Sequence, residues 1–172
     1  ARDIAPIFTM ELGKTINESL AEIERSATFL DWDSEEIRRL YGRIVPTDPP
    51  IQQFVVREPI GPVAAFTPWN VPMSAPSRKI SASLAAGCSI ILKPASETPA
   101  TACLFAQCFM DAGLPKGVLN VVFGDSDEVS RTLILSPITR MVSLTGSVNV
   151  GRRLMLLAAE AMKPTLMELG GH

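Results

Sequence analysis

The sequence predicts an α/β fold built on a parallel sheet, and three observations support this prediction. Beyond about residue 60, short apolar runs alternate with helical stretches, which is the pattern of βαβ units. A polar residue or a glycine follows each apolar run, as expected where parallel strands end at one functional edge. Residues 1–43 instead carry apolar side chains at helical spacing, so N-terminal helices are expected to precede the sheet.

The N-terminal region is expected to form helices followed by a proline-rich linker. Residues 33–36, Asp-Ser-Glu-Glu, are predicted to start a second helix, because such side chains favour helix N-termini. Prolines then end this region, and residues 52–57 form a short extended run. We therefore divide the chain into a helical segment, residues 1–50, that packs on the remainder, residues 51–172. The residues behind these predictions are Ile16, Leu20, Ile23, Ala27 and Leu30 in the first helix, Ile37, Leu40 and Tyr41 in the second, and Pro46, Pro49 and Pro50 in the linker.

The second part is expected to contain five strands, with a helix between each strand and the next. Thr98 is predicted to cap one of these helices, with Pro99 in the first helical position, and Ser147 could cap another. The predicted strands are residues 63–67, 89–92, 118–122, 141–144 and 165–167, and the predicted helices are 77–86, 98–113, one that begins at 126, and 147 to about 162.

Composition excludes several classes of function. The net charge of −2 argues against nucleic acid as a partner, and no apolar run is long enough to span a bilayer. The N-terminus lacks the layout of a signal peptide. The three cysteines, Cys88, Cys103 and Cys108, lack metal-ligand spacing, so we expect no metal site and reduced, buried thiols in a cytoplasmic protein.

The residues that follow the predicted strands form a candidate ligand site, although each has a simpler alternative. Asn70 could donate its amide to a developing oxyanion, or it could be an ordinary turn residue. Lys93 could bind ribose hydroxyls or a phosphate, or it could be a loop lysine. Gly146 and Ser147 could hold a pyrophosphate at a helix N-terminus, or they could only cap that helix.

Two further residues complete this set. Glu168 could be a general base, or it could be a salt-bridged loop carboxylate. Trp69 could wall a pocket, or it could belong to the core. The dinucleotide fingerprint G-x-G-x-x-G is absent, so a nicotinamide site in this chain would not be of the common Rossmann kind.

Several stretches together resemble the aldehyde dehydrogenase family, in that family's order and at about its spacing across the whole chain. The resemblance implies a cofactor domain with a Rossmann-like five-stranded sheet, here residues 51–172, and, in the family, a catalytic domain and an oligomerisation flap. The matching stretches are residues 59–63 (PIGPV), 67–72 (TPWNVP), 84–88 (LAAGC), 92–99 (LKPASETP), 112–115 (AGLP), 120–122 (NVV), 144–147 (LTGS) and 168–171 (ELGG).

The resemblance implies an NAD(P)-dependent oxidation of an aldehyde to a carboxylic acid. In the family a cysteine thiolate attacks the aldehyde and forms a thiohemiacetal, whose oxyanion Asn70 would help to hold. Glu168 would activate the water that hydrolyses the resulting thioester. Lys93 would hold the adenosine ribose, and the backbone of Leu169 would approach the nicotinamide end. The cofactor-binding residues that the resemblance implies are Thr67, Trp69, Asn70, Lys93, Ala95, Ser96, Gly124, Gly146, Ser147 and Leu169.

The resemblance also bears on the cofactor and the partners. NAD-specific members often carry Glu at the position of Ser96, and serine removes a charge that would repel a 2′-phosphate. We therefore expect NAD or NADP as cofactor, with a leaning towards NADP. The stretch 93–99 is closest to the succinate-semialdehyde branch. The expected partners are an aldehyde substrate and further copies in a homodimer or homotetramer, with neither nucleic acid nor membrane.

The nucleophile is where the chain departs from the family pattern. In the family this cysteine lies a few dozen residues after the Glu-Leu-Gly-Gly motif, and Cys88, Cys103 and Cys108 all precede it. We therefore expect the catalytic domain to be absent from this chain, and the chain alone to be inactive. A non-catalytic nucleotide-binding module and an inactive truncated fragment are the alternative interpretations.

Overall fold

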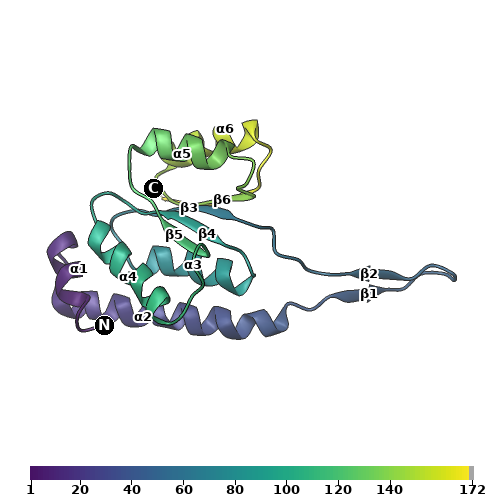
Figure 1. Cartoon of the computed structure of the whole chain (residues 1–172), viewed down its shortest axis with the longest axis horizontal. Helices are drawn as coiled ribbons and strands as arrows, with labels where there is room; N and C mark the ends of the chain where they lie inside the picture. The colour runs from purple at the N-terminus through teal and green to yellow at the C-terminus, as the bar shows by residue number, and fades with distance from the viewer. Residues whose placement is uncertain (171–172) are drawn as a thin grey trace.

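A five-stranded parallel sheet lies between two layers of helices in the computed structural model, which describes residues 1–170 (Figure 1). Its strands are β3 (Val63–Phe66), β4 (Ile90–Lys93), β5 (Leu119–Val121), β6 (Met141–Gly146) and β7 (Thr165–Leu169). One face is covered by α1 (Ala5–Leu12), α2 (Ile16–Glu36), α3 (Ser74–Ala85) and α4 (Pro99–Asp111). The other face is covered by α5 (Ser126–Leu135) and α6 (Val148–Glu160). The predicted α/β fold with N-terminal helices is confirmed.

The central strand β3 organises the sheet, whose strand order is β5-β4-β3-β6-β7. All four of its residues are buried, because their side chains alternate between two cores. Val63 and Ala65 belong to the core under α1–α4, whereas Ala64 and Phe66 belong to the core under α5 and α6. The chain runs outward from β3 to β5 and then returns to β6, so the strand order reverses at β3. Ligand crevices in open α/β sheets form at the carboxyl ends of strands at such a reversal.

The second N-terminal helix predicted from residues 33–36 does not exist. Helix α2 runs without a break from Ile16 to Glu36, and a short 3₁₀ turn, η1 (Ile37–Arg39), follows it. The hydroxyl of Ser34 donates to the carbonyl of Asp31 at 2.7 Å, inside the helix, so it caps nothing. The actual start of α2 is the capping box of Thr15 and Glu18. The acidic side chains therefore lie in the last turn of one long helix.

The predicted proline linker is the connection of a β-hairpin. Strand β1 (Arg43–Val45) pairs antiparallel with β2 (Gln53–Val55), and the hairpin extends away from the body of the molecule (Figure 1). Strand β2 lies within the extended run predicted for residues 52–57. The division of the chain at residue 50 falls inside this connection and stays a prediction.

Helix α4 begins at Pro99 as predicted, but Thr98 does not cap it. The Thr98 hydroxyl is buried and has no hydrogen-bond partner among the described residues. The carboxylate of Glu11, on α1, instead accepts from the backbone N–H groups of Ala100 at 2.6 Å and Thr101 at 2.8 Å. The cap is therefore tertiary, and local sequence could not reveal it.

Candidate functional site

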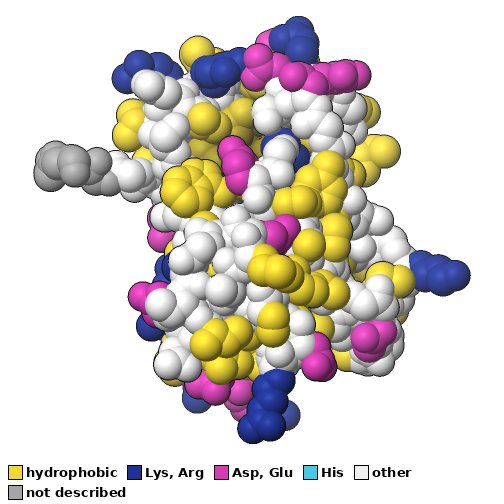
Figure 2. Space-filling model, turned by 90° about the vertical axis from the view of Figure 1, so that its left-hand side faces the viewer, with side chains coloured by type: hydrophobic (Ala, Val, Ile, Leu, Met, Phe, Trp, Pro, Cys, Tyr) yellow, Lys and Arg dark blue, Asp and Glu magenta, His cyan; other side chains and the backbone are white. Residues whose placement is uncertain are grey.

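Two adjoining clefts lie at the carboxyl edge of the sheet, where the loops after β3, β4, β6 and β7 meet. The first has a volume of about 350 Å³ and the second about 390 Å³. They share Pro68, Trp69, Thr145, Gly146 and Ser147. Figure 2 views this edge, with charged side chains gathered mainly at its top and bottom and mostly hydrophobic or uncharged side chains between them.

The structure brings all but one of the predicted site residues into these clefts. Gly124 is the exception: it lies in the loop between β5 and α5 and lines neither cleft. The first cleft contains Thr67, Trp69, Lys93, Ala95, Ser96, Gly146 and Ser147, and the second contains Trp69, Asn70, Gly146, Ser147, Glu168 and Leu169. Gly171, the last residue of the Glu-Leu-Gly-Gly motif, lies outside the described residues.

Several residues that line the clefts were not among the site residues predicted from the sequence. The first cleft also contains side chains from α5 and α6, which approach the sheet edge only through the fold. Thr145 is the most consequential, because it contacts a predicted catalytic residue. It sits one residue before Gly146, so it was adjacent to a recognised position but carried no signal of its own. The additional lining residues are Phe66, Pro68, Glu97, Ser126, Ser130, Leu144, Thr145, Val150 and Leu154 in the first cleft, and Gly170 in the second.

Two buried polar groups in the first cleft have unused hydrogen-bonding capacity. Lys93 ends β4 and is only 8% exposed, yet within residues 1–170 its ammonium donates only to the neighbouring Pro94 carbonyl, at 3.4 Å. The hydroxyl of Thr67 is buried and has no partner among the described residues. A buried ammonium and a buried hydroxyl without partners are costly, unless a ligand supplies acceptors. Ribose hydroxyls and phosphate oxygens are such acceptors, so these residues fit a nucleotide cofactor.

The N-terminus of α6 opens onto both clefts. Ser147 caps the helix by accepting from the backbone N–H of Val150 at 3.3 Å, which confirms the capping interpretation. The positive end of the helix dipole and the free N–H groups of its first turn also favour an anion at this point. The predicted pyrophosphate role is therefore compatible with the cap and stays a prediction.

Glu168, on the edge strand β7, is held by two neighbours. The Thr145 hydroxyl donates to its Oε2 at 3.0 Å, and the Arg78 guanidinium lies 3.5 Å from its Oε1. Arg78 also packs 4.6 Å from the centre of the Phe29 ring. The Glu168 side chain is 58% exposed, so solvent can reach it. The contacts of Glu168 are those of a salt-bridged carboxylate, which was the alternative interpretation, although the residue lies on a strand and not in a loop. The general-base role stays a prediction.

Lys79 is a buried cation near Glu168. It is 8% exposed and donates to the hydroxyl of Ser143 at 2.9 Å. Burial lowers the pKa of Lys79 from 10.5 to about 8, because the charged ammonium loses solvation. The charge of Glu168 acts in the opposite direction, and that of Arg78 lowers the pKa further. Lys79 therefore changes charge closer to neutral pH than an exposed lysine does.

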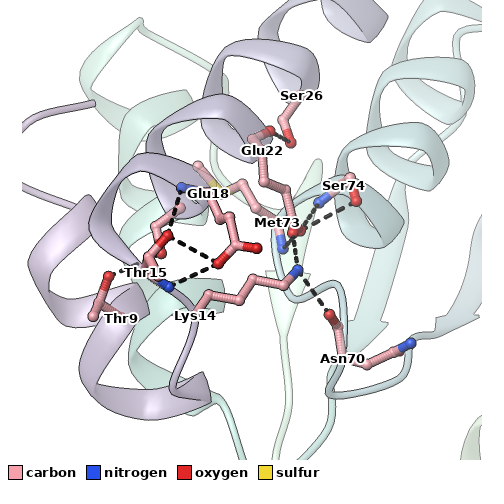
Figure 3. Close-up of polar contacts among 10 residues, drawn as sticks. Thr9, Lys14, Thr15, Glu18, Glu22, Ser26, Asn70, Met73 and Ser74 are labelled. Carbon is pink, nitrogen blue, oxygen red and sulfur yellow. Dashed lines mark hydrogen bonds and ion pairs between the residues drawn. The ribbon is translucent and has the colours of Figure 1, made fainter.

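Trp69 and Asn70 project from the loop that joins β3 to α3. Trp69 is 54% exposed and lines both clefts, so the core alternative for this residue is wrong. The main-chain carbonyl of Asn70 accepts from the ammonium of Lys14 at 3.1 Å (Figure 3). Its side-chain amide forms no hydrogen bond within residues 1–170 and is open to the second cleft. That amide is therefore available to a ligand.

Comparison with known proteins identifies the family. Residues 1–172 match the description "Aldehyde dehydrogenase family". The chain belongs to the aldehyde dehydrogenase family. It is 46% identical over 170 residues to 4-(hydroxymethyl)benzenesulfonate dehydrogenase TsaD1 of Comamonas testosteroni, covering 98% of this chain and 36% of that protein. It is 42% identical over 171 residues to the NADP(+) succinate-semialdehyde dehydrogenase GabD of Escherichia coli strain K12, covering 99% of this chain and 36% of that protein.

A solved structure agrees with the sequence comparison. Succinate-semialdehyde dehydrogenase from Burkholderia pseudomallei superposes with a TM-score of 0.95 at 44% identity, covering 99% of this chain and 36% of that one. This aldehyde dehydrogenase chain therefore spans about a third of the length of the relatives it matches. The shared region contains the sheet, both helical layers and the N-terminal helices.

The three cysteines differ in their exposure to solvent. Cys88 is buried as expected, but Cys103 and Cys108 are exposed, because α4 turns Thr101, Ala102 and Phe105 inward instead. Within residues 1–170, no helix is long and apolar enough to cross a membrane. In the same residues, no group of three or more His, Cys, Asp or Glu side chains is placed to hold a metal ion.

Replacing Lys79 by Met should remove a pH dependence of stability. The folded pKa of about 8 lies below the ordinary 10.5, so the unfolded chain binds more protons between these values. The free energy of unfolding therefore rises with pH across this window, by up to about 3 kcal/mol at roughly 1.4 kcal/mol per pKa unit. Urea unfolding of the wild-type and Lys79→Met chains, below, within and above this pH window, measures their free energies of unfolding. The same pH dependence in both chains would contradict the prediction.

Proposed function

We propose that this chain is the NAD(P)-binding part of an enzyme that oxidises an aldehyde to a carboxylic acid. The observation that carries the proposal is the adjacency of two clefts with complementary chemistry. One holds Thr67 and Lys93, whose polar groups have little or no hydrogen bonding within residues 1–170. The other holds the Asn70 amide, which has no partner in that range, and the carboxylate of Glu168. A redox cofactor in the first cleft would extend towards the reacting groups in the second.

In the first cleft, the chain's own residues would bind and orient the cofactor. Lys93 and Thr67 would donate to ribose hydroxyls or a phosphate, and the N-terminus of α6 would receive the pyrophosphate. The exposed ring of Trp69 would form one wall, and the backbone of Leu169 would bound the far end. The bound cofactor would supply the acceptor for the hydride that leaves the substrate.

In the second cleft, two groups would act on the substrate. Asn70 would donate its amide to the oxyanion that forms when a cysteine thiolate attacks the aldehyde carbonyl. Glu168 would take a proton from the water that hydrolyses the thioester. The guanidinium of Arg78, 3.5 Å from Oε1 of Glu168, would help to orient the carboxylate. The nucleophilic cysteine would come from a part of the full-length enzyme outside this chain, so the chain alone would not turn over.

A nucleotide-binding module without catalysis is the second candidate function. Its support is that the first cleft is formed by this chain alone, without a catalytic domain. Calorimetric titration of purified residues 1–172 with NAD(P)+ separates a nucleotide-binding chain from an inactive fragment. Saturable binding supports both the enzyme and the module, and the absence of binding would favour the inactive-fragment interpretation. Turnover by the full-length protein then decides between enzyme and module.

Replacing Ser96 by Glu should shift cofactor preference from NADP towards NAD. The introduced carboxylate would repel a 2′-phosphate but could accept hydrogen bonds from a free 2′-hydroxyl. We expect the ratio of kcat/KM for NADP+ to that for NAD+ to fall by about tenfold or more in the full-length enzyme. Ser96→Ala, which adds no charge, is the control. Strict NAD use by the wild-type enzyme would contradict the proposal of dual cofactor use.

Replacing Glu168 by Gln should slow deacylation more than hydride transfer. The amide cannot accept the proton from water, and a general base contributes about a hundredfold or more. Stopped-flow assays of the full-length enzyme with succinate semialdehyde, an aldehyde named for one relative, should then show a burst of reduced cofactor before a slow steady state. Glu24→Gln, on the exposed side of α2, is the control. An unchanged steady state without a burst would count against the role.

We also propose that the full-length enzyme is a cytoplasmic homodimer or homotetramer. The β1–β2 hairpin supports association, because it exposes Ile44 (74%), Phe54 (60%) and Val56 (70%) beside free strand edges. Phe54→Glu should place a charge in this apolar surface and lower the molecular mass measured by light scattering. A monomeric wild-type enzyme would be inconsistent with the proposal.

A further inference from the structure

The buried carboxylate of Glu22 fastens the start of α3 from a different helix. The side chain is 8% exposed, and its Oε1 accepts from the backbone N–H groups of Met73 at 3.3 Å and Ser74 at 3.1 Å, and from the Ser74 hydroxyl at 3.2 Å (Figure 3). The N-cap residue of α3, Met73, provides no side-chain cap of its own. Glu22 therefore caps a helix more than forty residues further along the chain, at about the position where its partial positive charge is greatest.

The ammonium of Lys14 connects this carboxylate to Asn70. It lies 2.5 Å from Oε2 of Glu22 and donates to the main-chain carbonyl of Asn70 at 3.1 Å (Figure 3). The same ammonium is 5.6 Å from the centre of the Phe8 ring, and Phe8 is fully buried. Lys14 is thus held by a carboxylate and an aromatic ring, and its remaining donor fixes the main chain of Asn70.

The Asn70 side chain depends on this support, because no neighbour holds its amide. Within residues 1–170 the amide makes no hydrogen bond, so the position of the main chain limits which points the amide can reach. The main chain is fixed on one side by the end of β3 and on the other by the start of α3, which Glu22 caps. A donor that stabilises a transition state must be in place before the charge develops.

We propose that Lys14 and Glu22 are positioning residues for the Asn70 amide, acting through the Asn70 carbonyl and the first amides of α3. The proposal rests on the proposed oxyanion role of Asn70. It assigns a function in the chemical step to Lys14, in the connection between α1 and α2, and to Glu22, on α2, neither of which lines a cleft. Lys14 sets the main chain at Asn70, and Glu22 holds both Lys14 and the following helix in register.

Lys14 and Glu22 could instead have a purely structural role, in which they stabilise the fold without affecting the Asn70 amide. The contacts of the two residues allow this role to be separated from the positioning role. The bonds of Glu22 to Met73 and Ser74 stabilise α3, and they would do so whether or not Asn70 takes part in catalysis. The bond of Lys14 to Asn70 reaches no amide of α3, so it contributes nothing to capping that helix. Changing Lys14 removes the bond to Asn70 and the cation beside Glu22, whereas changing Glu22 removes the cap of α3 directly, so Lys14 is the better residue to test.

The test is a double-mutant cycle in the full-length enzyme with Lys14→Met, Asn70→Ala and both together. Stopped flow measures the rate of hydride transfer at saturating cofactor, and fluorescence titration measures cofactor affinity. Lys14→Met should slow hydride transfer by about tenfold, as a displaced group does, with the dissociation constant of the cofactor unchanged. Lys14→Arg, which keeps the charge and the donors, should recover most of the rate. In the Asn70→Ala background, Lys14→Met should have no further effect.

The outcomes separate failure of this inference from failure of the proposed function. If Asn70→Ala slows hydride transfer but Lys14→Met is harmless, or costs the same factor in both backgrounds, the positioning role is overturned and the function stands. If Asn70→Ala leaves the rate unchanged, the oxyanion role itself is wrong, and the inference that rests on it is overturned as well. Should Lys14→Met fail to fold, Lys14→Gln keeps one donor, and the same cycle is measured with it.

Discussion

The parallel pairing of β3 with both β4 and β6 is the constraint on which the remaining structure depends. Parallel pairing places the carboxyl ends of all three strands at one edge. Because β3 is buried on both faces, the sheet also requires a helical layer on each side. The loops that connect strands to those layers therefore start at the same edge. This is why residues as distant in sequence as Trp69, Lys93, Ser147 and Glu168 lie around two adjoining clefts.

Three buried charges near this edge differ in how well they are satisfied, and the differences separate structural from ligand-facing groups. Glu22 accepts from a cation, two backbone amides and a hydroxyl, so it is fully committed to the fold. Among residues 1–170, Lys79 has one neutral acceptor, and burial lowers the pKa of Lys79 to about 8. Among the described residues, Lys93 has only a long contact to an adjacent carbonyl. A nearly buried ammonium with so little internal compensation is consistent with the cofactor contact proposed for Lys93.

The sequence predicted what depends on local pattern and missed what depends on tertiary contacts. The inner strands β3, β4 and β6 were predictable, because a strand covered on both faces is a largely apolar run between helices. The edge strands β5 and β7 are only partly buried, but they too follow helices as short apolar runs. The start of a helix at residues 33–36 and the Thr98 cap were wrong, because capping preference is weak and long-range contacts override it. Cys103 was judged by residue type, whereas the rotation of α4 decides its exposure. The edge-facing residues were found because strand ends can be read from sequence, and Thr145 was missed because only its register with Glu168 makes it relevant.

The N-terminal helices are energetically part of the site although they precede the sheet in sequence. Helices α3 and α4 both begin near the carboxyl edge, and neither N-cap residue provides a side-chain cap. Glu22 caps the first and Glu11 caps the second, each with a carboxylate at the positive end of the helix dipole. Each such cap contributes about 1 kcal/mol or more, and uncapped amides at this edge would loosen the loops that carry Asn70 and Ser96. A boundary at residue 50 can therefore divide the chain by composition. The hydrogen bonds that hold the starts of α3 and α4 beside the clefts nevertheless join residues on the two sides of that boundary.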